Sequence, residues 1–102
     1  MASGVARYRA GEWKAAVAAL ERSMELGRGV DAVERLFGDV VDRLFLAMAY
    51  RKLGDRDQAR KYYDQAVQSL QKASSTLDRN PERAEELRRF QSEAEEVLEL
   101  KK

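Results

Sequence analysis

The chain contains no cysteine and no histidine among its 102 residues. Without cysteine it can form neither a disulfide nor a thiolate metal site. Without histidine it lacks the commonest general base and the commonest metal ligand of proteins. The spacing of an EF-hand, a nucleophile elbow and a phosphate-binding glycine loop are also missing. We therefore expect no metal, no cofactor and no enzymatic activity.

Neither a surplus of charge nor a long apolar run is present. Nineteen basic and 18 acidic residues leave a net charge of +1. Proteins that bind nucleic acid normally gather a positive surplus on one face, so we expect no nucleic-acid partner. The longest apolar run, Leu44 to Tyr50, is far shorter than the roughly 20 residues that span a bilayer. Because the N-terminus also lacks the apolar segment of a signal peptide, we expect a cytoplasmic location and no membrane contact.

What is present is helical periodicity. The chain has a single proline and no alternating segments rich in Val, Ile and Thr, which favours helices throughout. Apolar residues recur at helical spacing in four stretches, preceded by a short helix near 5–10. The stretches cover about 13–24, 31–53, 55–77 and 81–98. Gly38 lies inside the second stretch, and both a continuous helix and a helix broken at this glycine fit the pattern.

The expected helix ends carry recognisable signals. Two capping boxes are predicted, at Asp31 with Glu34 and at Asp55 with Gln58. Each is expected to stabilise its helix by about 1 kcal/mol. The stretch 27–29, Gly-Arg-Gly, is predicted to end a helix, because glycine adopts the positive φ that helix C-termini often need. Asn80 is predicted as an N-cap, with Pro81 at the first helical position, where its missing N–H is harmless.

Two segments of the chain align with each other, 8–20 with 51–63. In both, a glycine is followed by an alanine five positions later and by a large apolar residue four positions beyond that. This spacing resembles the helix turn of a tetratricopeptide repeat. The second segment matches the small and large packing positions of that family best, at Leu46, Ala47, Tyr50, Gly54, Ala59, Tyr63 and Ala66.

The resemblance implies an all-α fold of antiparallel helix hairpins, tetratricopeptide-like, with a C-terminal capping helix. We expect one domain over 1–102, with unit one at about 4–28, unit two at about 31–78 and the capping helix at about 81–100. The separation of Gly11 from Gly54 exceeds the usual repeat of about 34 residues, so the helices of unit two are expected to be long. Three short segments, 20–26, 45–50 and 85–90, also resemble the repeat regions of large bacterial multidomain proteins. This resemblance would make the chain a part of a longer one.

In this family partners generally bind on the inner face, which the first helix of each unit forms. Carried onto this sequence, the resemblance predicts a partner-binding surface at Tyr8, Arg9, Val41, Leu44, Phe45, Met48, Arg51 and Lys52. Alternatively, the last helix or a second copy of the chain covers the apolar members of this surface. The family's two-carboxylate clamp for chaperone tails is absent, because its positions are occupied by Val5, Leu44, Phe45 and Met48.

Two functions follow. The first is a protein–protein interaction module, or scaffold, that binds a peptide or a helix of a partner. The alternative is a self-associating structural domain, a homodimer with or without exchanged helices, that buries apolar residues such as Leu36, Phe37, Val40 and Phe45. The last helix carries a seam, Leu87, Phe90, Ala94 and Val97, that either caps the stack within one chain or meets a second copy. Trp13 is predicted to be a core residue rather than a ligand-stacking one.

Overall fold

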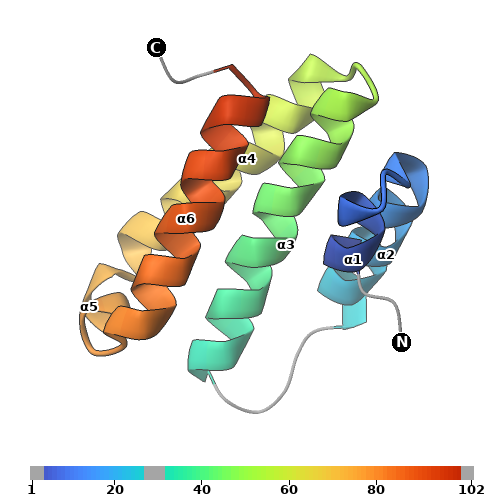
Figure 1. Cartoon of the computed structure of the whole chain (residues 1–102). Helices are drawn as coiled ribbons and strands as arrows, with labels where there is room; N and C mark the ends of the chain where they lie inside the picture. The colour runs from blue at the N-terminus through green and yellow to red at the C-terminus, as the bar shows by residue number, and fades with distance from the viewer. Residues whose placement is uncertain (1–3, 27–31, 100–102) are drawn as a thin grey trace.

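The computed structural model describes residues 4–26 and 32–99, and all the elements formed by these residues are helices (Figure 1). They are α1 (Gly4–Arg9), α2 (Trp13–Leu26), α3 (Ala32–Lys52), α4 (Arg56–Lys72), α5 (Ser74–Asp78) and α6 (Pro81–Val97). The predicted all-α class is confirmed. Of the predicted helix ends, 27–29 and Asp31 lie outside the described residues.

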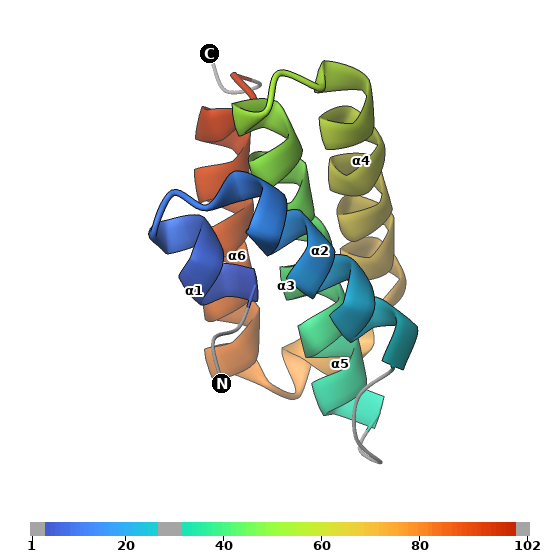
Figure 2. The ribbon, with the colours of Figure 1, turned by 90° about the vertical axis from the view of Figure 1, so that its right-hand side faces the viewer.

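The helices form two antiparallel hairpins and a further helix. The first hairpin is α1 with α2, the second is α3 with α4, and α6 runs beside α3 in the same direction (Figure 1). As a result the C-terminal ends of α1, α3 and α6 lie at one end of the molecule. Seen from the side, α2 crosses in front of α3, with α4 to the right and α6 to the left (Figure 2).

The two aligned glycines form equivalent turns. Gly11 and Gly54 have φ of +84° and +88°, a left-handed conformation that glycine adopts without a steric penalty. Each amide donates to a carbonyl three residues earlier, Gly11 to Tyr8 at 3.0 Å and Gly54 to Arg51 at 3.1 Å. The repeat recognised in the sequence is therefore a repeat of the turn that joins the two helices of each hairpin.

Helix α3 is the centre of the molecule. It continues without a break through Gly38, which is buried, and this decides between the two patterns left open by the sequence. Most of its second half is buried, because α1, α2, α4 and α6 all pack against it. The residues of α3 with no exposed surface are Val40, Leu44, Phe45, Leu46, Ala47, Met48 and Ala49.

Alanine at the family's small positions allows α3 and α4 to approach closely. Ala47 of α3 and Ala66 of α4 have no exposed surface, and Ala59 is 1% exposed. No side chain larger than a methyl group separates the helices at these positions. Tyr63 of α4 is buried beside them, and its hydroxyl donates a 3.0 Å hydrogen bond to Glu95 of α6.

The helix expected over 55–77 is shorter than predicted. Helix α4 ends at Lys72, and Ala73, with φ −100° and ψ 14°, leaves the helical conformation before α5 begins at Ser74. At this point the Ala73 amide donates to the Ser69 and Gln71 carbonyls and closes the last turn of α4. The bend returns Leu77 to the core, against which it packs.

The predicted caps are confirmed at one position and corrected at another. Asp55 accepts a 3.1 Å hydrogen bond from the Gln58 amide, as expected at the start of α4. Asn80 does occupy the N-cap of α6, but its side chain makes no capping hydrogen bond and instead donates to the Thr76 carbonyl at 2.8 Å. This bond ties α5 to the start of α6. Pro81 is the first residue of α6, as predicted.

Candidate protein-binding face

The inner face is the surface that α1, α3 and α6 form together. At its centre Phe45 of α3 has no exposed surface and lies between aromatic residues of the two flanking helices. Its ring meets Tyr8 of α1 edge-on at 5.4 Å between centroids, and Phe90 of α6 edge-on at 5.2 Å. Such edge-to-face pairs contribute about 0.5–1.5 kcal/mol beyond the burial of their area. Phe45 therefore holds α1 and α6 on opposite sides of α3.

The aromatic cluster extends to the second helix. Trp13, the first residue of α2, lies 5.2 Å from Tyr8 between ring centroids and packs, partly buried, against the core. Lys52, at the end of α3, places its Nζ 5.8 Å from the centre of the Trp13 ring, within the range of a cation–π contact. The structure thus uses Trp13 as a packing residue with one side open to a cation.

An ion pair crosses the inner face above Phe45. Arg9 of α1 donates through Nη2 to Glu93 Oε1 at 2.8 Å and through Nη1 to Glu93 Oε2, a two-bond arrangement that fits the planar guanidinium. The guanidinium carbon lies 5.2 Å from the centre of the Phe45 ring. Arg9 is half exposed and Glu93 is less so, which leaves the pair open to water and to competing groups.

The ion pair changes the ionisation of its neighbours. The hydrogen bond to Glu93 raises the pKa of Arg9, so this side chain stays charged at any physiological pH. Burial raises the pKa of the Tyr8 phenol, with Glu93 adding to this rise and Arg9 opposing it. Tyr8 therefore remains a neutral packing residue, and the charges beside it are those of Arg9 and Glu93.

The eight residues predicted to bind a partner divide into two groups. Five are buried: Tyr8, Val41, Leu44, Phe45 and Met48. The other three are basic and reach solvent. Arg9 and Lys52 are exposed, and Arg51 is partly so. We call these three the basic rim. The alternative stated for the apolar members, coverage by the last helix, holds for Phe45, whose ring meets Phe90 of α6.

Two residues of the inner face were absent from the predicted set, Phe90 and Glu93 of α6. The apolar seam of α6 did indicate Phe90, because Phe90 is one of the four residues spaced to face another helix. No pattern singled out Glu93 among the many carboxylates of this helix, because its partner lies 84 residues away in the sequence. Only the three-dimensional arrangement brings the two together.

The apolar residues expected to support self-association are covered within one chain. Val40 and Phe45 have no exposed surface, and Leu36 and Phe37 pack, partly buried, against the core. The guanidinium carbon of Arg83 lies 4.6 Å from the centre of the Phe37 ring and shields it further. Among the described residues, Leu53 is the single large hydrophobic side chain classed as exposed, at 39%. The four residues named for self-association are thus wholly or partly buried within one chain.

Antiparallel helix pairs that close on small residues, joined by left-handed glycine turns and stacked beside a further helix, define a helical-repeat protein. Residues 44–72 match the family model of the tetratricopeptide repeat, so this segment carries a tetratricopeptide repeat, as predicted. No curated protein and no solved structure matches the chain. Repeats of this family generally mediate protein–protein interactions and are not in general enzymes.

Over 4–26 and 32–99, no helix is both long enough and apolar enough to cross a membrane. No group of three or more acidic side chains is arranged there to hold a metal ion.

Proposed function

We propose that the chain is a protein–protein interaction module that binds a peptide or a helix of a partner on the inner face, at the basic rim. The proposal assigns it no catalytic role. The observation that carries it is the position of Arg9, whose half-exposed guanidinium covers the Phe45 ring and already binds a carboxylate presented by a helix.

The chemistry of the rim supports this proposal. Arg9 binds Glu93 of α6 in the geometry that a carboxylate of a partner would also use. Lys52 lies over Trp13 and offers a cation beside an aromatic surface. A partner helix or peptide with acidic residues would pair with the rim. The aromatic cluster beneath holds Arg9 and Lys52 in place.

The buried members of the predicted surface have a second role in this proposal. Phe45 and Tyr8 support the guanidinium of Arg9 from below, with its carbon 5.2 Å and 5.9 Å from the two ring centres. A side chain held in this way loses little conformational freedom when it binds, which favours association. We therefore assign contact with the partner to the rim and positioning of the rim to the aromatic residues.

The proposal is tested by selecting peptides from a random displayed library on the immobilised chain and measuring their affinities by fluorescence anisotropy. We expect Arg9→Gln and Lys52→Gln each to weaken binding of the selected peptides by about threefold to tenfold, because each removes one exposed charge of the rim. Arg88→Gln is the matched control, since Arg88 is exposed on α6, and it should change the affinity by less than about twofold.

Circular dichroism spectra of all variants establish that the fold is retained. A library that yields no binder would contradict the proposal. So would peptides that bind both rim variants as tightly as the wild-type chain, because their binding site would then lie elsewhere.

A further inference from the structure

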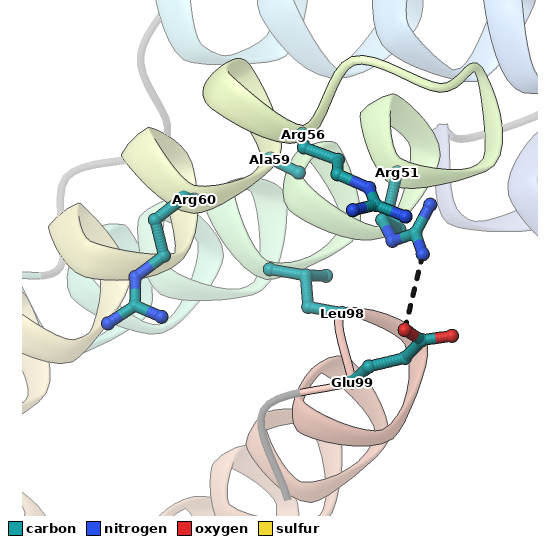
Figure 3. Close-up of a pocket in the computed structure, with 6 residues that line it drawn as sticks. All are labelled: Arg51, Arg56, Ala59, Arg60, Leu98 and Glu99. Carbon is teal, nitrogen blue, oxygen red and sulfur yellow. Dashed lines mark ion pairs between the residues drawn. The ribbon is translucent and has the colours of Figure 1, made fainter.

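A pocket of about 290 Å³ opens at the end of the molecule where α3 and α6 end and α4 begins (Figure 3). Its lining consists of Arg51, Arg56, Ala59, Arg60, Leu98 and Glu99. Three of these six residues are arginines and one is acidic. The pocket shares Arg51 with the basic rim, but its other residues come from α4 and from the end of α6.

The single carboxylate of the pocket is loosely held. Glu99 Oε2 lies 3.5 Å from Arg51 Nη2, which is longer than the roughly 2.7–2.9 Å of a close charge-assisted hydrogen bond. The Glu99 side chain is 74% exposed, whereas that of Arg51 is 20% exposed. The arginine is thus a fixed part of the pocket wall, and the carboxylate that meets it is mostly in water.

The backbone of Glu99 also opposes this contact. Its φ of 60° is left-handed, a conformation that residues other than glycine adopt infrequently. Glu99 comes directly after Leu98, the C-cap of α6, where the partial negative charge of the helix disfavours an acidic residue. A carboxylate from another chain carries neither disadvantage and can compete for the same arginine.

A second cation of the pocket is available to such a carboxylate. Arg56 is exposed and makes no ion pair with any residue in the described ranges, 4–26 and 32–99. In Figure 3 its guanidinium and that of Arg51 both project toward the Glu99 end of the pocket. Arg60, in contrast, points away and is bound to Asp64 at 3.0 Å.

Apolar surface completes the pocket. Ala59 is 1% exposed at its floor, and the side chain of Leu98 lies between the arginines and α6 (Figure 3). An anion with aliphatic carbon beside its charge therefore fits this wall better than a bare inorganic ion. Aspartate and glutamate side chains in a peptide have this composition.

We propose that Arg51 and Arg56 form a binding site for a carboxylate side chain of an acidic peptide segment, and that Glu99 occupies the site as an internal substitute. This proposal rests on the proposed function in one respect, that the ligand is a segment of a partner protein. It adds the class of residue that the partner must present and the position on α3 and α4 where that residue binds.

The test uses two small peptides on the full chain, acetyl-leucyl-glutamyl amide and its uncharged counterpart acetyl-leucyl-glutaminyl amide. Binding is followed through the Nε–Hε NMR signals of the arginines, with inorganic phosphate titrated separately as a second source of anion. We expect the glutamyl peptide to shift the Arg51 and Arg56 signals saturably and to bind more tightly than phosphate, and the glutaminyl peptide to cause no saturable shift.

Variants separate the roles within the pocket. Arg56→Gln is expected to weaken the glutamyl peptide by about fivefold or more, and Arg60→Gln, the matched control, by less than about twofold. Glu99→Gln is expected to strengthen it by about twofold to fivefold, because the internal competitor is removed.

Three results would overturn the proposal. They are an equal response to the glutaminyl peptide, phosphate binding at least as tight as that of the glutamyl peptide, and unchanged affinity in both Arg56→Gln and Glu99→Gln. The rim variants Arg9→Gln and Lys52→Gln should leave this affinity unchanged. The pocket and the inner face can therefore fail independently.

Discussion

Replacing Phe45 with alanine is expected to lower the free energy of unfolding by about 3–5 kcal/mol. Phe45 has no exposed surface, and its ring touches Tyr8 of α1 and Phe90 of α6. The substitution removes the burial of a large apolar side chain and leaves a cavity between three helices that can close only in part. Urea denaturation followed by circular dichroism measures the loss.

Leu53→Ala serves as the control for this substitution, because Leu53 is 39% exposed and should change the stability by no more than about 0.5 kcal/mol. A domain of this size has a total stability of roughly 5–15 kcal/mol, so the Phe45→Ala loss would be a large share of the whole. A loss no greater than that of Leu53→Ala would mean that Phe45 is not at the centre of the core.

Replacing Leu87 with alanine is expected to cost about 2–5 kcal/mol of stability. Leu87 lies in the middle of α6 and has no exposed surface, which requires that α6 be docked on the rest of the chain. The neighbouring Arg88 is exposed, and Arg88→Ala should leave the free energy of unfolding within about 0.5 kcal/mol of the wild type.

The pair Leu87→Ala and Arg88→Ala also reports on the orientation of α6, because the two residues differ by one position on the same helix. Thermal and urea denaturation of both variants give the comparison. Equal stability of the two variants would indicate that α6 does not bury its Leu87 side against the rest of the chain.

Local features of the sequence predicted much of the hairpin architecture. Gly11 and Gly54 were recognised by their equal spacing to an alanine and a large apolar residue, and both adopt the same left-handed turn. The helical periodicity of 31–53 predicted a long helix, which α3 is over Ala32–Lys52. These features are local in the chain, since a turn and the faces of one helix depend on residues within a few positions of each other.

Whether the residues of the predicted surface are exposed or buried could not be predicted from such local features. Phe45 and Met48 have the spacing of groove residues, yet whether they face a partner or the last helix depends on where α6 packs. That position is set by long-range contacts such as Arg9 with Glu93. The break at Ala73 was missed for a similar reason, because the apolar spacing continues through it while the backbone turns to bring Leu77 to the core.

The arrangement of the inner face has a consequence for binding. A partner that reaches only the rim finds Arg9 and Lys52, both held by aromatic rings. A partner that reaches Phe45 must first separate Arg9 from Glu93 and move α6, which would break the Phe45–Phe90 contact as well. The rim is therefore the part of this face that can be bound without rearranging the core.

In this structure α6 packs on Phe45 of α3 within a single chain. This packing is tested most directly by an isotope-filtered nuclear Overhauser experiment on a mixture of labelled and unlabelled protein. The structure predicts strong contacts between the Phe45 and Phe90 rings, whose centroids are 5.2 Å apart, within one labelled molecule and none between molecules. Contacts seen only between labelled and unlabelled molecules, or no contact at all, would contradict it.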